Sequence, residues 1–328
     1  MSAKVLAAGC VPAGAPARFL TASSSRLGGR ADITLLLPPV ELVRRPVSLM
    51  IVMHGLFGSH WNWLALGGLG DLAHDMWRQG VLPPLVIALP SDGLRGDGTG
   101  YLPTHDGDYE SWILEDVPAA VADDTRLTDP SAPILLAGNS MGGRISIEVG
   151  LRYPERVKSL ALLCPAVAFI KRDYHPIVRL LRPEFGVLPH RFTRGMVAAQ
   201  FWSLFRDRDA VDPSVADIAC DEFQRIYGSA GARFAFLSSA RNIYLDKPFG
   251  RGGFYPRLSE LSAPSLFVWG THDPLIPQAF KRHVERWLPR ADQVVLDNCG
   301  HVPQIERADH LAEICRPGVV VVPVPGLV

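Results

Sequence analysis

Residues 134–147 read ILLAGNSMGGRISI, and this stretch decides the fold. An apolar run ends in the motif G-N-S-M-G centred on Ser140, and a segment with helical periodicity follows at once. This is the pattern G-x-S-x-G in the strand–turn–helix context of a nucleophile elbow. The two glycines suit a turn that is too tight for Cβ atoms two residues on either side of the serine. The pattern therefore predicts that the Ser140 hydroxyl projects above the sheet edge as a nucleophile.

The helix that follows is expected to begin at Ser140, so that its N–H groups face the charge that develops on an attacked carbonyl. The alternative interpretation is an ordinary glycine-rich turn between a strand and a helix, because a five-residue match alone is weak evidence. The flanking sequence and two later motifs favour the nucleophile.

Those two motifs carry an acid and a base, in the order Ser, Asp, His along the chain. A serine hydroxyl needs a base to remove its proton, and the base needs a carboxylate to fix its tautomer. The motif F-V-W-G-T-H-D-P places Asp273 just past a strand end, and D-N-C-G-H-V-P places His301 after the final strand. We predict that Asp273 is the acid and His301 the base. Asp297 ranks second as the acid, because it is expected still to belong to the strand.

A loop near the start of the chain predicts donors for an oxyanion. The motif H-G-L-F-G begins at His54, directly after an apolar run at 47–53. The backbone N–H groups of Leu56 and Met141 are predicted to bind the oxygen of a tetrahedral intermediate. His54 is expected to orient this loop rather than to carry protons.

The sequence predicts no metal and no cofactor. The remaining histidines lack the spacing of metal ligands, and the motif H-E-x-x-H does not occur. The five cysteines are scattered and include no C-x-x-C pair, which argues against a disulfide framework and mildly favours a reducing compartment. Two of them, Cys164 and Cys299, are interpreted as small buried apolar residues.

The composition is typical of a globular enzyme, with 48% hydrophobic and 20% charged residues in a chain of 328. The 33 basic and 33 acidic residues cancel, so nothing points to nucleic acid or an anionic membrane surface as a partner. No apolar run approaches the ~20 residues of a membrane span. The apolar stretch before Cys10 is too short for a signal peptide, so it is interpreted as an unstructured leader or an edge strand. A cytoplasmic location is predicted, and a homodimer is left open.

Strands and helices alternate through most of the chain, which predicts βαβ units and a mainly parallel sheet. Strands are expected at 31–36, 47–53, 85–89, 134–137, 159–163, 264–269 and 293–296, and helices at 61–78, 111–123, 140–153, 278–287 and 308–315. The alternation stops for about 90 residues of helical, aromatic and proline-punctuated sequence, which predicts an inserted helical cap. The expected domains are a first part of the core at 1–165, the cap at 166–258 and a second part of the core at 259–328.

Taken together, the motifs H-G-x-x-G, G-N-S-M-G-G, G-T-H-D-P and G-H-V-P-Q-I-E resemble those of the α/β-hydrolase superfamily, over roughly residues 30 to 316. The resemblance implies an α/β-hydrolase fold, in which helices flank a mainly parallel sheet and a helical cap is inserted. It also implies that Ser140 is the nucleophile, His301 the base and Asp273 the orienting acid. Leu56 and Met141 would be the donors of the oxyanion hole.

The two halves of the chain resemble different groups within that superfamily. The first half, with P-S-D-G from Pro90 and Y-E-S-W from Tyr109, is similar to a group that includes feruloyl and S-formylglutathione esterases. The second half, with its cap and the motif around His301, is similar to the meta-cleavage-product C–C hydrolases. Many of those enzymes carry Trp where this chain has Val302, which weakens the C–C interpretation. Epoxide hydrolases and haloalkane dehalogenases need an Asp nucleophile, so Ser140 argues against both.

The cap sequence gives the clues to a substrate. Its aromatic residues are Phe201, Trp202, Phe205, Phe223, Tyr227, Phe234, Phe236 and Tyr244. Most are expected to pack the cap against the core, and a minority to line an apolar acyl or aromatic pocket. Arg172, Arg194 and Arg241 are candidates to meet a substrate carboxylate, although solvated surface charge is the stronger expectation for each.

The sequence therefore predicts a serine hydrolase that cleaves a carboxylic ester of a small apolar or aromatic substrate through an acyl-enzyme on Ser140. The alternative enzyme is a C–C bond hydrolase of a dienoate-type substrate. An acyltransferase and a non-catalytic binding protein are further alternatives. The last would normally lack part of the triad, and none is missing here.

Overall fold

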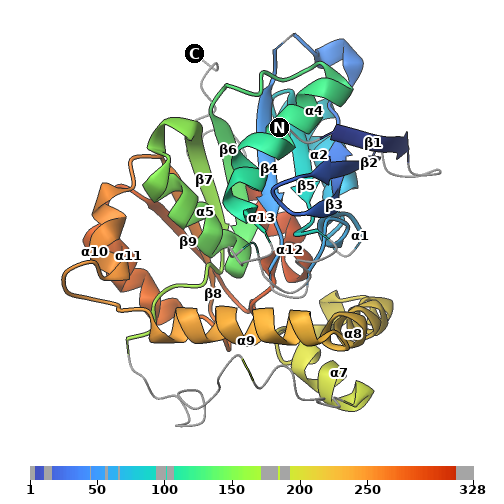
Figure 1. The fold of residues 1–328 in the computed structure, drawn as a ribbon. Coiled ribbons are helices and arrows are strands. Elements are labelled where there is room, and N and C mark those ends of the chain that lie inside the picture. The colour runs from blue at the N-terminus through green and yellow to red at the C-terminus, as the bar shows by residue number, and fades with distance from the viewer. Residues whose placement is uncertain are drawn as a thin grey trace.

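A nine-stranded sheet forms the centre of the computed structural model (Figure 1). The structure describes residues 4–10, 17–44, 46–55, 58–65, 67–93, 101, 107–170, 184 and 193–314. The strands are β1 (Lys4–Cys10), β2 (Ala17–Ser24), β3 (Gly29–Leu36), β4 (Ser48–Met53), β5 (Leu85–Pro90), β6 (Ile134–Asn139), β7 (Val157–Leu163), β8 (Ser265–Gly270) and β9 (Asp292–Leu296). Their order across the sheet is β1-β2-β3-β5-β4-β6-β7-β8-β9.

The six strands from β4 to β9 run parallel to one another, as the alternation of strands and helices predicts. The exception is the N-terminal side of the sheet, where β1, β2 and β3 form an antiparallel meander that joins β5 antiparallel. The sequence predicts only one strand before residue 47 and leaves an edge strand open, whereas the structure has three. The second of them, β2, alternates buried and half-buried positions from Leu20 to Ser24, which is the period-two pattern of a strand with one covered face.

Helices cover both faces of the sheet, and the buried side chains of the strands divide between them. The first face is covered by α3 (Tyr109–Ser111), α4 (Val117–Thr125), α5 (Met141–Arg152), α10 (Phe254–Arg257) and α11 (Lys281–Trp287). The second face is covered by α1 (Asn62–Ala65), α2 (Leu69–Arg78) and α13 (Ala308–Ile314). The short helix α12 (Pro303–Glu306) comes just before α13. In β5, Val86 and Ala88 pack in the first core cluster, and Ile87 and Leu89 in the second. A strand covered on both faces needs such a continuous apolar run.

The helix predicted at 61–78 is broken in the structure. Its first turn ends with α1, and α2 begins only at Leu69. Gly68 between them has φ +58, a left-handed conformation that interrupts a right-handed helix and that glycine adopts without a Cβ penalty. The prediction of one continuous helix was wrong, because the apolar periodicity of the sequence continues across Gly68 although the helix does not.

Three helices lie together beyond one end of the sheet, in the chain between β7 and β8 (Figure 1). They are α7 (Arg194–Trp202), α8 (Pro213–Tyr227) and α9 (Ala230–Leu245), called here the cap helices. Each begins at a residue whose side chain accepts a hydrogen bond from a free N–H of the first turn: Thr193, Asp212 and Ser229. The division of the chain into a core and a separate cap domain stays a prediction.

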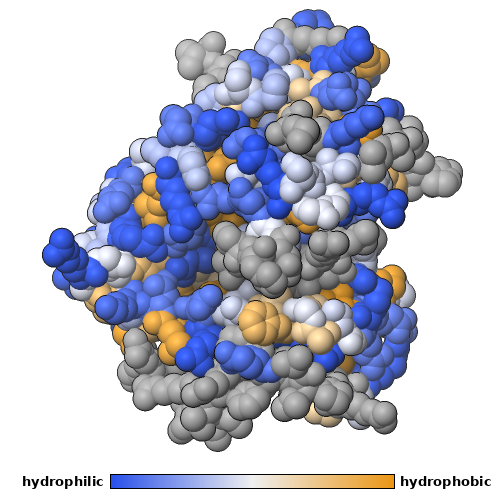
Figure 2. Space-filling view, viewed as in Figure 1, coloured by the Kyte–Doolittle hydropathy of each residue, from blue (hydrophilic) through white to orange (hydrophobic). Residues whose placement is uncertain are grey.

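The face of the molecule seen in Figure 2 is mostly hydrophilic, with hydrophobic side chains in small scattered groups. Within the part of the chain that the structure describes, none of the helices has the length and apolar character needed to cross a membrane.

Candidate active site

Ser140 occupies a strained turn between β6 and α5. Its φ of 55° and ψ of −114° lie in a region that residues with a side chain rarely adopt. The neighbouring glycines are required by close packing. A Cβ on Gly138 would lie 2.4 Å from the carbonyl carbon of Gly142, and a Cβ on Gly142 would lie 2.4 Å from the carbonyl oxygen of Met53. The tight turn that the motif predicts is therefore confirmed.

Backbone hydrogen bonds hold this turn against the next strand. The N–H of Ser140 donates to the carbonyl of Leu163 at 3.0 Å, and its carbonyl accepts from the N–H of Ala166 at 2.9 Å. The turn is fixed from both sides, so the strain at Ser140 is balanced by contacts around it.

His301 and Asp273 meet at the same edge of the sheet, and both are buried. The distance between His301 Nδ1 and Asp273 Oδ2 is 2.7 Å. The other carboxylate oxygen, Oδ1, accepts hydrogen bonds of 2.8 Å from the N–H groups of Leu275 and Ile276. A carboxylate that accepts a hydrogen bond from Nδ1–H leaves Nε2 as the acceptor of the ring. This is the tautomer that a general base needs.

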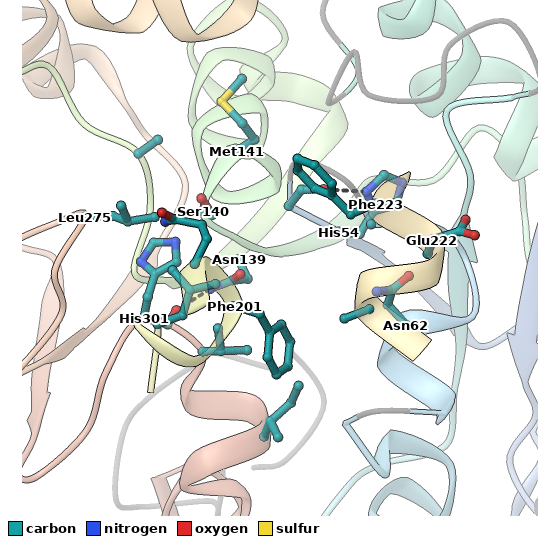
Figure 3. A pocket seen from close by; sticks show the side chains of 18 of the residues that line it. His54, Asn62, Asn139, Ser140, Met141, Phe201, Glu222, Phe223, Leu275 and His301 are labelled. Atoms are coloured by element: carbon teal, nitrogen blue, oxygen red, sulfur yellow. Dashed lines mark hydrogen bonds between the residues drawn. The ribbon is translucent and has the colours of Figure 1, made fainter. Parts of the chain in front are cut away.

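The Nε2 atom of His301 is buried and has no hydrogen-bond partner among the described residues. Figure 3 shows Ser140 and His301 together at one side of a pocket. Both residues line this pocket, so the nucleophile and base predicted from the sequence share one cavity.

Asp297, the second-ranked acid, lies elsewhere. Strand β9 ends at Leu296, so Asp297 is an exposed turn residue and not part of the strand as expected. The carboxylate that accepts the hydrogen bond of His301 Nδ1 is that of Asp273.

Of the two predicted oxyanion donors, the structure describes one. Met141 is the first residue of α5, and its N–H is among those without a partner inside the helix. Leu56 lies outside the described residues. Gly55 just before it packs directly on Ser140, since a Cβ there would lie 3.4 Å from the Cβ of Ser140.

His54 is buried beside this loop. Its Nδ1 lies 2.8 Å from the carbonyl oxygen of Gly55, and its Nε2 lies 3.8 Å from Oδ1 of the buried Asp92. Burial lowers the pKa of His54 to about 4. The ring is therefore neutral at physiological pH, and its hydrogen bond to the loop supports an orienting role.

The depressed pKa of His54 predicts an acid-sensitive fold. In the unfolded chain the ring takes up a proton below pH ~6.5, whereas in the folded chain it does so only near pH 4. The unfolded state thus binds more protons in this window, and the free energy of unfolding falls as the pH falls from 6.5 to 4. Between pH 7.5 and 5 we expect this group to remove roughly 2 kcal/mol of stability. The measurement is the free energy of unfolding in urea, at both pH values, for the wild type and His54→Asn. If both proteins lose the same free energy of unfolding between pH 7.5 and 5, the pH effect does not come from His54.

Sequence reasoning assigned no role to Asn139, the residue before Ser140. Its Nδ2 donates to the carbonyl oxygens of Leu163 and His301, at 3.1 Å each. The amide thus ties the nucleophile turn to the histidine loop. The signal was present, since Asn139 lies inside the G-N-S-M-G motif, but its partners come from distant parts of the chain.

One group of three potential metal ligands lies close together in the described residues: Cys164, Asp273 and His301, with ligand atoms within 4.8 Å of one another. Two of these side chains are already joined by the hydrogen bond described above. Burial, reinforced by the Asp273 carboxylate, raises the pKa of the Cys164 thiol well above its usual value. The thiol stays protonated at neutral pH, and a protonated thiol is a poor metal ligand.

The pocket is a cavity of about 660 Å³ between the sheet edge and the cap helices. Six of the eight aromatic side chains singled out in the cap sequence line it: Phe201, Phe205, Phe223, Tyr227, Phe236 and Tyr244. The expectation that only a minority of them line a pocket is therefore wrong. Aromatic side chains from all three cap helices face the same cavity. They therefore contact one another and line the cavity at the same time.

Among the described residues that line the cavity there is no Lys or Arg. Arg194 instead pairs with Asp217 and Asp221 on the surface, and Arg241 is not part of the lining. Arg172 lies outside the described residues. The one acidic side chain of the lining is Glu222, which appears opposite Ser140 in Figure 3.

Comparison with known proteins agrees with this architecture. The family described as the α/β hydrolase fold matches residues 48–308. The chain is 26% identical over 227 residues to a pimeloyl-[acyl-carrier protein] methyl ester esterase of Aeromonas salmonicida, covering 67% of this chain and 80% of that one. It is 27% identical over 250 residues to a 2-hydroxymuconate semialdehyde hydrolase of a Pseudomonas species, covering 75% and 82%. A solved meta-cleavage product hydrolase of Pseudomonas fluorescens superposes with a TM-score of 0.57 at 16% identity, covering 88% and 93%.

The chain belongs to the α/β hydrolase fold family, and it is a hydrolase. The fold class predicted from the four motifs is confirmed.

Proposed function

We propose that the protein is a carboxylic ester hydrolase that acts on a small apolar or aromatic substrate through an acyl-enzyme on Ser140. One observation carries the proposal. Ser140 and His301, whose ring is hydrogen-bonded to Asp273, line an apolar, aromatic cavity whose described lining includes no Lys or Arg.

The mechanism follows from the tautomer of His301. Nδ1–H donates to Asp273, so the Nε2 lone pair takes the proton of the Ser140 hydroxyl as the oxygen attacks the ester carbonyl. The imidazolium then returns this proton to the leaving alkoxide, and an acyl-enzyme remains. Water, deprotonated by the same nitrogen, attacks the acyl group and frees Ser140. Asp273 stays ionised throughout and stabilises the imidazolium.

The negative oxygen of each tetrahedral intermediate needs N–H donors. The N–H of Met141 at the start of α5 is one, and the N–H of Leu56 is the second in this proposal. The contact of Gly55 with Ser140 supports this placement, because it brings the loop that carries residue 56 against the nucleophile.

The cap helices act in this proposal as a cap that selects the substrate. Their aromatic side chains suit an apolar acyl chain or ring. A substrate carboxylate would meet Glu222 and no Lys or Arg among the described lining residues, and this lining disfavours a buried negative charge. We therefore favour esters of neutral acids over anionic substrates.

A second candidate, a C–C bond hydrolase of a dienoate-type substrate, is supported by the similarity to a 2-hydroxymuconate semialdehyde hydrolase. Such a substrate carries a carboxylate. The charge of the acyl part therefore separates the two candidates.

The experiment compares p-nitrophenyl esters of increasing acyl length, with and without a terminal carboxylate. We expect a burst of p-nitrophenol, an optimum in chain length, and at least roughly tenfold higher kcat/KM for a neutral ester than for its carboxylate-bearing counterpart. The Ser140→Ala variant is the control for background hydrolysis. No turnover of any ester, together with cleavage of a vinylogous diketone carboxylate, would replace the first candidate with the second.

A further inference from the structure

Glu306 is a buried carboxylate at the end of α12, in the G-H-V-P-Q-I-E motif. It accepts three backbone hydrogen bonds. Oε2 accepts from the N–H of Gly300 at 2.7 Å, and Oε1 accepts from the N–H groups of Arg206 and Asp207 at 2.9 and 2.6 Å. The carboxylate therefore joins two backbone segments that are about a hundred residues apart in the chain.

One of these segments is the loop of the proposed base, and the other leads from α7 toward α8. A fourth hydrogen bond joins them directly, from the N–H of His301 to the carbonyl of Leu204 at 2.7 Å. The contact is close enough that a Cβ on Gly300 would lie 2.1 Å from that carbonyl oxygen. The two segments also share a hydrophobic cluster, in which Phe205 packs with Val302.

We propose that Glu306 is a positioning residue, which fixes the histidine loop to the cap segment at 204–207 and so couples the place of His301 to the place of the cap helices. Both sides of the junction line the cavity, through Leu204 and Phe205 on one side and Val302 and Ile305 on the other. A shift of α7 is transmitted through the carboxylate to the backbone next to His301. This inference rests on the proposed roles of Ser140 and His301.

The chemistry of the junction requires a carboxylate. All three partners of Glu306 are N–H donors. Glutamine has nearly the same shape but presents one oxygen and one NH₂ group, so one end must place a donor against a donor. If its oxygen faces residues 206 and 207, its NH₂ group opposes the N–H of Gly300. If the amide is reversed, the NH₂ group opposes the two cap donors.

The test is Glu306→Gln, followed by the rate at which a small fluorophosphonate labels Ser140. This reaction needs the nucleophile and its base but not the natural substrate. We expect the labelling rate to fall roughly 10- to 100-fold, because a displacement of about 1 Å in a catalytic group costs up to 10²-fold. We also expect the midpoint of the pH dependence of labelling to move, since the surroundings of the His301 ring change. A purely structural role would lower the melting temperature and leave both readouts unchanged.

Glu313→Gln is the matched control. It makes the same substitution at an exposed position of α13, outside the junction. Its labelling rate is expected to stay within twofold of the wild type. Equal rates for folded Glu306→Gln and wild type would overturn the inference.

Glu306→Asp is a second variant, for use if the glutamine variant does not fold. It keeps the charge but is too short to reach both segments, so a wild-type labelling rate in that folded variant would equally overturn the inference. An unlabelled wild type would instead refute the proposed function. The two failures are therefore distinct.

Discussion

Ser140→Ala is expected to lower ester turnover on the order of 10⁶-fold, to the level that binding and the oxyanion donors alone provide. The loss is large because no other described hydroxyl occupies the turn between β6 and α5, where His301 can act on it. The measurement is steady-state turnover of the preferred p-nitrophenyl ester, with fluorophosphonate labelling followed by intact-protein mass.

Alanine is a suitable replacement because it keeps the Cβ atom. The conformation with φ 55° is equally unfavourable for serine and alanine, so the thermal midpoint of unfolding should not change. Turnover above about one per cent of wild type in this folded variant, or labelling at another residue, would refute the assignment of the nucleophile.

Asp273→Asn is expected to lower kcat roughly 10⁴-fold, the effect that the same substitution has on the acid of a Ser-His-Asp triad. The reason lies in the second carboxylate oxygen. The N–H groups of Leu275 and Ile276 both need an acceptor at Oδ1, so an asparagine amide must place its oxygen there. Its NH₂ group then faces Nδ1 of His301, which is forced to accept. The ring consequently carries its proton on Nε2 and cannot take the proton of Ser140.

Asp297→Asn is the control for this prediction. Its side chain is exposed in the turn after β9, and we expect its kcat to stay within about twofold of wild type, as is typical of surface substitutions. Stopped-flow acylation rates for both variants separate the chemical step from product release. A larger loss in Asp297→Asn than in Asp273→Asn would mean that the acid has been assigned to the wrong residue.

The features that the sequence predicts well are those encoded within a few adjacent residues. The nucleophile turn is one, since the glycines at 138 and 142 are required by contacts of the local strand–turn–helix unit. The meeting of Asp273 and His301 at one edge of the sheet is another, because parallel strands deliver their following loops to the same edge. The buried strands β5 and β6 were also recognised, as their apolar runs are continuous.

Contacts between distant segments could not be predicted in this way. The amide of Asn139 and the carboxylate of Glu306 both stand inside quoted motifs, yet their partners lie far away in the chain. The direction of the cap aromatics is a similar case. Helical spacing tells which residues share a face, but only the packing of α7, α8 and α9 against one another decides that this face borders a cavity.

The backbone conformation of Ser140 brings thermal stability into conflict with the need for a serine hydroxyl at this position. A non-glycine residue held in such a conformation raises the energy of the folded chain by on the order of 1–3 kcal/mol. Selection for thermal robustness alone would therefore place glycine at this position and discard the hydroxyl. Substitutions that raise thermal stability without loss of the hydroxyl must therefore lie away from this turn. A screen for thermal stability alone would not identify the variants with the highest catalytic rate.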